Sequence, residues 1–144
     1  MFFKRFKDEG NSKNTSRGEV AEKFAQDFLK AQKLTIVETN YLTPRGELDI
    51  IAKQGDMLVF VEVRLRSNQQ FGSAADSIDH RKQQRLIHAA THYLQSTQQW
   101  DKVSCQFDAL CLTPDSENTG YGDSKSHKPM QYQVEWIRNA FSVG

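Results

Sequence analysis

The sequence contains few of the residue types that mark specialised protein classes. Its 144 residues include only two cysteines and three prolines. No apolar run approaches the ~20 residues that a membrane-spanning helix needs. Charged side chains within residues 1–7 (MFFKRFK) also interrupt any signal-peptide core. We therefore expect a soluble, cytoplasmic protein that does not contact membranes.

The two cysteines and the net charge exclude few further classes of protein. Cys105 and Cys111 lie in one predicted strand, where an extended chain holds them roughly 20 Å apart, so they cannot form a disulfide with each other. The net charge of +1 neither requires nor forbids a nucleic-acid partner, because binding depends on where the charges lie. Hydrophobic residues make up 38% of the chain, which is enough for the core of one domain.

Hydrophobic periodicity predicts an α/β fold. Helices are predicted over Gly18–Lys33 and Ser77–Gln99, where apolar residues recur at intervals of three and four. Strands are predicted at Leu34–Tyr41, Glu47–Lys53, Met57–Arg66, Val103–Leu112 and Gln131–Ile137. A helix between two strands normally connects a parallel pair, and the last strand is expected at an edge. The expected architecture is a mixed sheet of about five strands flanked by helices.

Two segments differ in composition from this predicted domain. Residues 1–16 are rich in Lys, Asn and Ser and predict a flexible basic arm before a domain at residues 17–144. Residues 113–130 contain hardly an apolar side chain and predict a flexible insertion.

Charged side chains interrupt two neighbouring apolar strands. Glu62 and Arg64 share one face of the most apolar strand, and Asp49 lies on the strand before it. Carboxylates inside a sheet are costly unless they are paired or bind a cation, so Asp49 and Glu62 predict a shared site. Oxygen ligands without Cys or His favour Mg²⁺ or Mn²⁺. The alternative interpretation is a Glu62–Arg64 salt bridge with Asp49 as a turn residue.

These segments resemble the YraN-like family, a bacterial group similar to archaeal Holliday-junction resolvases within the PD-(D/E)xK nuclease superfamily. The resemblance extends from about Gly18 to Phe141 and is carried by Gly46–Ile51, Val59–Arg64 and Gln106–Asp108. It implies a single restriction-endonuclease-like domain that cleaves DNA phosphodiester bonds, including those of branched DNA, with the help of a metal ion. Resolvases that cut two strands symmetrically are dimers, so the resemblance also raises a homodimer as an expectation.

The resemblance assigns roles to individual residues. Asp49 matches the motif aspartate of the superfamily, and Glu62–Arg64 match its (D/E)xK motif. Glu22 on the first helix matches the acidic residue that resolvase-like members add to the metal site. Arg64 stands where the pattern has Lys; arginine keeps the charge and grips phosphate, but its pKa is too high for proton exchange.

Lys82, near the start of the second helix, is predicted to reach back to the site and replace the missing lysine. The catalytic set is then Asp49, Glu62, Arg64 and Lys82, and the metal ligands are Glu22, Asp49 and Glu62. Plainer interpretations exist for two of these residues. Lys82 is otherwise a solvated or phosphate-contacting lysine, and Glu22 a solvent-facing helix residue.

Two further features have structural interpretations. Asp108 lies in an apolar strand and is interpreted as a partner for a buried arginine, such as Arg64 or Arg81. His88 and His92 have zinc-ligand spacing, but no Glu stands beside the first His as a metalloprotease motif requires. Both histidines are therefore interpreted as helix-surface residues.

Basic side chains gather around the predicted site, and a nucleic-acid-binding set is predicted from them: Arg45, Arg66, Arg81, Lys82 and Arg85. An acidic floor for metal and a basic rim for phosphates suit DNA cleavage. The sequence contains no motif that recognises specific bases, so we expect recognition of the DNA backbone or of branched shape. The second function class is a catalytically silent nucleic-acid-binding or protein-interaction module on the nuclease fold.

Overall fold

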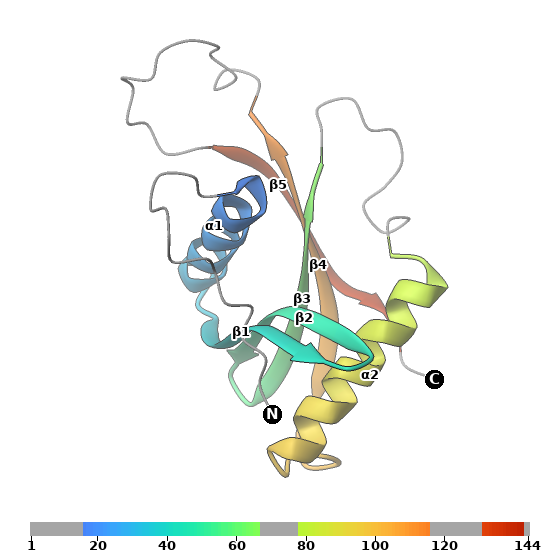
Figure 1. The fold of residues 1–144 in the computed structure, drawn as a ribbon. Coiled ribbons are helices and arrows are strands. Elements are labelled where there is room, and N and C mark those ends of the chain that lie inside the picture. The colour runs from blue at the N-terminus through green and yellow to red at the C-terminus, as the bar shows by residue number, and fades with distance from the viewer. Residues whose placement is uncertain (1–15, 67–77, 116–130, 143–144) are drawn as a thin grey trace, which may run out of the picture.

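The computed structural model describes residues 16–66, 78–115 and 131–142, and these form two helices and five strands (Figure 1). The helices are α1 (Arg17–Ala31) and α2 (His80–Ser96). The strands are β1 (Thr35–Thr43), β2 (Gly46–Gln54), β3 (Met57–Leu65), β4 (Cys105–Pro114) and β5 (Tyr132–Phe141). The predicted α/β class, with one mixed five-stranded sheet in a single small domain, is confirmed.

The strands follow one another across the sheet in the order β1-β2-β3-β4-β5. Strands β1, β2 and β3 pair antiparallel through short turns, and β4 pairs antiparallel with β5. Between them, β3 and β4 are parallel and are connected through α2. The predicted parallel pair and the predicted edge position of the last strand are both confirmed.

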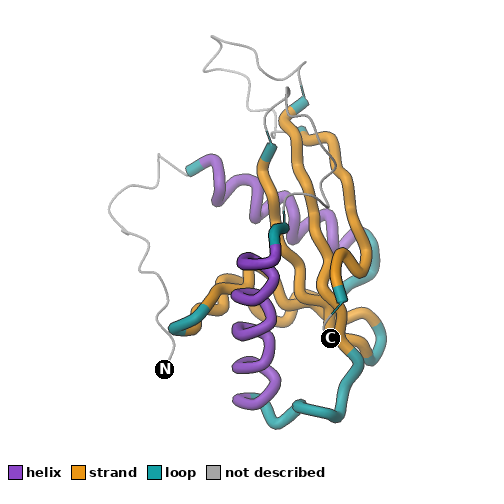
Figure 2. The backbone as a smooth tube through the Cα atoms, turned by 90° about the vertical axis from the view of Figure 1, so that its right-hand side faces the viewer, coloured by secondary structure: helices purple, strands orange, loops and turns teal. Residues whose placement is uncertain are grey.

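The two helices cover opposite faces of the sheet (Figure 1). Figure 2, viewed from the side of α2, shows this helix in front of the strands and α1 behind them. On β3, Val59 and Val61 pack in the cluster that contains α1, whereas Phe60 packs in the cluster that contains α2. A strand covered on both faces needs apolar residues at successive positions, which explains the long apolar run of β3. Alternation then places Glu62 on the α2 face, two residues beyond Phe60.

Side-chain caps fix where the helices begin. The Ser16 hydroxyl accepts the Glu19 N–H at 3.2 Å, and the Asp79 carboxylate accepts the Lys82 N–H at 2.8 Å. Because Asp79 is the cap, α2 starts at His80, a little later than the periodicity predicted. The same hydrogen bond holds the backbone of Lys82 in the first turn of α2.

Strand β4 ends two residues later than predicted. Thr113 and Pro114 pair with the start of β5, and the Asp115 N–H donates to the Gln131 carbonyl at 2.9 Å. Residues 113–115 of the predicted insertion are thus in or next to β4, and its residues 116–130 lie outside the described part of the chain. Residues 1–15 of the predicted basic arm lie outside it as well.

Both cysteines are free thiols, Cys105 exposed and Cys111 buried. Within the described ranges, no helix is both long and apolar enough to cross a membrane.

Candidate metal and phosphate site

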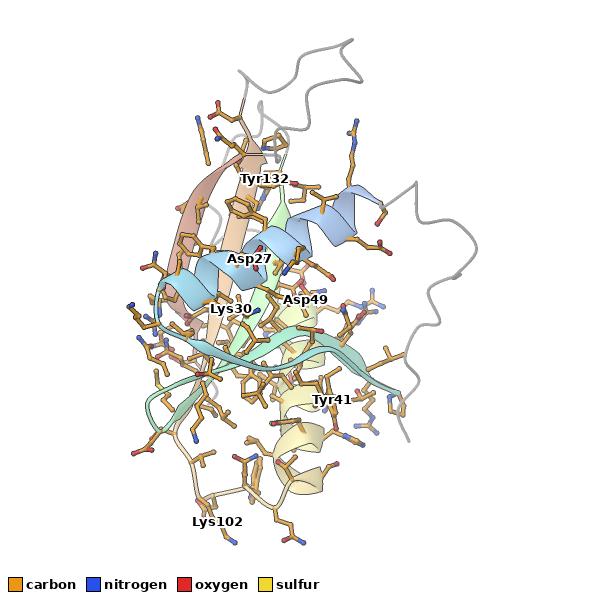
Figure 3. The ribbon with its side chains drawn as sticks, turned by 90° about the vertical axis from the view of Figure 1, so that its left-hand side faces the viewer. Asp27, Lys30, Tyr41, Asp49, Lys102 and Tyr132 are labelled. Atoms are coloured by element: carbon orange, nitrogen blue, oxygen red, sulfur yellow. The ribbon has the colours of Figure 1, made fainter. Side chains whose placement is uncertain are left out.

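The site forms where β2 separates from β3. The two strands pair from Gln54↔Met57 to Ile50↔Val61. Beyond the last pair, the Val63 N–H donates to Oδ2 of Asp49 at 2.9 Å. The Asp49 carboxyl thus takes the place of a strand carbonyl as the acceptor, which holds it beside β3. In Figure 3, Asp49 lies at mid-height in the molecule, between α1 and the hairpin of β1 and β2.

Glu62 is buried on β3, with 5% of its side chain exposed. Its Oε1 atom lies 3.1 Å from Nζ of Lys82 and 3.8 Å from a terminal guanidinium nitrogen of Arg64. Its Oε2 atom is also buried and has no hydrogen-bond partner while Asp49 is ionised; a protonated Asp49 can hydrogen-bond to Glu62. A buried carboxylate oxygen without a partner is costly, so this atom is suited to a cationic ligand.

The environment of Asp49 favours its neutral form. Burial, then the charge of nearby Glu62 and that of Glu22, raise the pKa of Asp49 from 3.8 to about 8, against the lowering effect of the Val63 hydrogen bond. Like charges confined in a low-dielectric site resist ionising together. A bound cation would remove this penalty and stabilise both carboxylates.

Of the three acidic residues predicted from the sequence, two lie together and the third acts on one of them from α1. Asp49 and Glu62 face one another closely enough to interact. Glu22 on α1 is half-buried and acts on Asp49 through its charge. Among the described residues, no three His, Cys, Asp or Glu side chains form a group that could hold a metal ion. The ligand role of Glu22 stays a prediction.

Asp49 and Glu62 nevertheless fit a hard divalent cation. Both offer carboxylate oxygens, one of these oxygens is buried without a partner, and Asp49 is crowded by negative charge. Mg²⁺ is typically held by one or two protein carboxylates together with water and substrate phosphate. A site with two carboxylates therefore suffices for it.

Lys82 makes the contact with Glu62 that the hypothesis of a replacement lysine requires. Its catalytic role stays a prediction. A cavity of about 280 Å³ adjoins this ion pair and is lined by Arg64, Asp79, Arg81, Lys82 and Arg85. Arg81 and Arg85 project from the same end of α2 as Lys82.

Two of the predicted nucleic-acid-binding residues lie away from this cavity. Arg45 is exposed in the turn between β1 and β2, where its N–H donates to the Thr43 hydroxyl. Arg66 follows β3, where its N–H donates to the Leu112 carbonyl at 2.8 Å. The predicted basic set is thus divided between one cavity and two separate positions.

The sequence did not reveal the importance of Gly46. A Cβ atom at this position would lie 2.3 Å from the carbonyl oxygen of Arg85. The hairpin of β1 and β2 therefore touches the backbone of α2 at a point where only glycine fits. This contact fixes the start of α2 against the sheet, and with it Lys82. The only sequence signal was a glycine in a turn.

Asp108 has a structural role, as predicted, but with a different arginine. Its carboxylate is buried and lies 2.8 Å from Nε of Arg138, so neither Arg64 nor Arg81 is its partner. It also accepts hydrogen bonds from Gln106, from the Trp136 indole and from the backbone of Asn139. The prediction of the partner was wrong because β5 has an irregular register opposite Asp108, where the Asn139 N–H and the Arg138 side chain both contact the carboxylate.

His88 and His92 of α2 are both exposed, and Nδ1 of His92 forms a hydrogen bond with the Tyr41 hydroxyl. This bond joins the outer face of α2 to β1. The interpretation of His92 as a helix-surface residue agrees with its position.

The fold and the site define a small α/β protein in which a buried and a partly buried carboxyl group lie together beside a basic cavity. Residues 21–112 match the family described as Uncharacterised protein family UPF0102. A UPF0102 protein of Nitrosomonas europaea is 43% identical over 126 residues, which cover 88% of this chain and 93% of the relative. A UPF0102 protein of Pseudomonas fluorescens is 42% identical over 124 residues, covering 86% and 91%. The chain therefore belongs to the UPF0102 family, and the resemblance to the YraN-like family is confirmed.

Proposed function

We propose that this protein is a cytoplasmic, metal-dependent endonuclease-like hydrolase that acts on DNA phosphodiester bonds, branched DNA included. The observation that carries the proposal is the carboxyl pair. Glu62 has a buried oxygen without a partner, and the Asp49 beside it has a pKa raised to about 8. Strongly perturbed carboxyl groups gather at functional sites more often than elsewhere. The similarity of the motif segments to the PD-(D/E)xK superfamily supports the same function.

Asp49 and Glu62 would hold Mg²⁺ or Mn²⁺, with Glu22 as a further acidic group. A divalent ion bound there supplies charge stabilisation for a phosphate under attack and lowers the pKa of a bound water. Lys82 and Arg64 contact Glu62 and also line the basic cavity, so their charges lie where a phosphate would develop negative charge. Lys82 is the one of the two that can exchange a proton, because a guanidinium stays protonated.

DNA is proposed as the substrate because the cations around the site suit a phosphate backbone. Arginine and lysine contacts to phosphate bind without reading sequence, which agrees with recognition of backbone or of branched shape. A homodimer belongs to this proposal, since symmetric cleavage of two strands needs two sites.

The proposal is tested by cleavage of labelled single-stranded, duplex, flap and four-way-junction DNA with Mg²⁺ or Mn²⁺. Asp49→Asn and Glu62→Gln are prepared in parallel, with Asp56→Asn as the matched control, because Asp56 is an exposed acid in the turn between β2 and β3. We expect cleavage by the parent protein and the control, and none above background by the two site variants. Equal cleavage by all four proteins would identify a contaminating nuclease and overturn the proposal.

The second candidate is a catalytically silent nucleic-acid-binding or protein-interaction module. It is favoured by the ion pair of Glu62 with Lys82 and Arg64, in which the chain's own cations already neutralise one carboxylate oxygen. Such a module would bind DNA equally with Mg²⁺ and with EDTA. It would show no cleavage above that of the Asp49→Asn variant.

A further inference from the structure

The basic cavity beside Glu62 is a concentrated source of positive charge. Four of its five lining side chains are cationic, and the fifth, Asp79, already accepts the Lys82 N–H as the helix cap. Three of the cations come from the first turns of α2 and one from the end of β3. The positive end of the α2 dipole adds to their effect on an anion.

Two of these cations have no acidic partner. Within the described residues, neither Arg81 nor Arg85 forms an ion pair with a carboxylate, and both are exposed. Like charges that line one cavity repel one another unless an anion lies between them. Guanidinium groups match the oxygens of phosphate with paired hydrogen bonds, which favours phosphate as the anion.

The size and position of the cavity restrict which ligands it can bind. A volume of about 280 Å³ is just below the usual range of ligand pockets and suits one phosphate group with its sugar. Lys82 and Arg64 line the cavity and also lie 3.1 Å and 3.8 Å from Oε1 of Glu62. A phosphate in the cavity would therefore adjoin the carboxyl pair.

We propose that this cavity binds one phosphate group of a DNA strand, and that it does so before any metal is bound. The phosphate is either a monoester at a strand end or an internal diester. The inference rests on the nucleic-acid partner of the proposed function but not on cleavage. Binding in EDTA can therefore fail or succeed whether or not the protein is a nuclease.

The experiment measures the affinity of the full chain, in EDTA, for a short fluorescent duplex that carries either a 5′-phosphate or a 5′-hydroxyl. Arg81→Gln and Arg85→Gln are compared with Lys102→Gln, which removes the same charge from an exposed position in the turn after α2, far from Asp49 in Figure 3. Each pocket variant is expected to lose on the order of tenfold in affinity. The slope of log affinity against log salt is expected to fall by about one, whereas Lys102→Gln should change neither quantity.

The two ends of the duplex distinguish the two sources of phosphate. A monoester site would give tighter binding of the 5′-phosphate duplex by the parent protein, with the difference lost in both pocket variants. A diester site would give equal binding of both duplexes and the same loss in the variants. Affinities of Arg81→Gln and Arg85→Gln equal to that of Lys102→Gln would overturn the proposal, even if the protein cleaves DNA.

Discussion

Asp49→Asn is predicted to stabilise the metal-free protein, and to do so increasingly as the pH rises. The pKa of Asp49 is about 8 in the folded protein and 3.8 for an ordinary aspartate. Between these values the folded protein holds a proton that the unfolded chain has released. Raising the pH through this window therefore lowers the free energy of unfolding, and above about pH 8 the loss is complete. Asparagine is neutral throughout, and its amide oxygen can still accept the Val63 N–H.

The size of the effect follows from the shift. At ~1.4 kcal/mol per pKa unit, the change from 3.8 to about 8 sets an upper bound of about 6 kcal/mol. The carboxyl keeps some contact with water, which screens its charge, so we expect a gain for Asp49→Asn that grows by about 2 kcal/mol between pH 5 and pH 8.5. For a chain of this length, this corresponds to roughly 4–8 °C in Tm.

Urea unfolding in EDTA, followed by circular dichroism at pH 5, 6.5 and 8.5, measures this difference. Asp56→Asn is the control. The Asp56 carboxylate is exposed, so its ionisation is not opposed by burial, and the substitution should give no gain in stability that depends on pH. A gain for Asp49→Asn that is constant with pH would refute the reasoning. So would a variant less stable than the parent at pH 8.5, because the carboxyl pair would then not be under electrostatic strain.

Three other experiments test contacts in and near the site. Gly46→Ala should cost about 1–3 kcal/mol of stability, measured by urea unfolding, because its methyl group must displace the Arg85 backbone; an unchanged midpoint would contradict this close approach. A double-mutant cycle of Lys82→Met with Glu62→Gln should give a coupling of about 1 kcal/mol in EDTA, and a coupling of zero would mean that the ion pair adds nothing. Asp108→Ala should cost about 3 kcal/mol, because it leaves a guanidinium, an indole N–H and a backbone N–H without their acceptor; a loss below 1 kcal/mol would show that water replaces the carboxylate.

The carboxyl pair could be anticipated from the sequence because strand alternation and a short turn are enough to bring the two side chains together. Asp49 and Glu62 lie on consecutive strands joined by a tight turn, so their proximity needs only the hairpin register. The approach of Lys82 followed from chain order, since α2 connects β3 to its parallel neighbour and must cross the sheet beside Glu62. These are consequences of local pattern and short connections.

Contacts that depend on backbone irregularities could not be anticipated. The pairing of Asp108 with Arg138 requires the irregular register of β5, where Asn139 has a φ of 50°. No pattern of residue spacing in the sequence predicts this irregularity. The approach of Gly46 to α2 depends on how closely the helix packs on the hairpin, which periodicity does not specify. The position of a helix against a sheet is set by many side chains acting together.

Binding of a divalent cation by Asp49 and Glu62 can be measured without knowing the correct DNA substrate. Mn²⁺ binding to the metal-free protein can be measured by electron paramagnetic resonance of the free ion. We expect saturable binding that is lost in Asp49→Asn and in Glu62→Gln and retained in Asp56→Asn. Equal Mn²⁺ binding by the parent and by all three variants would contradict it, because the ion would then be held by other acidic groups.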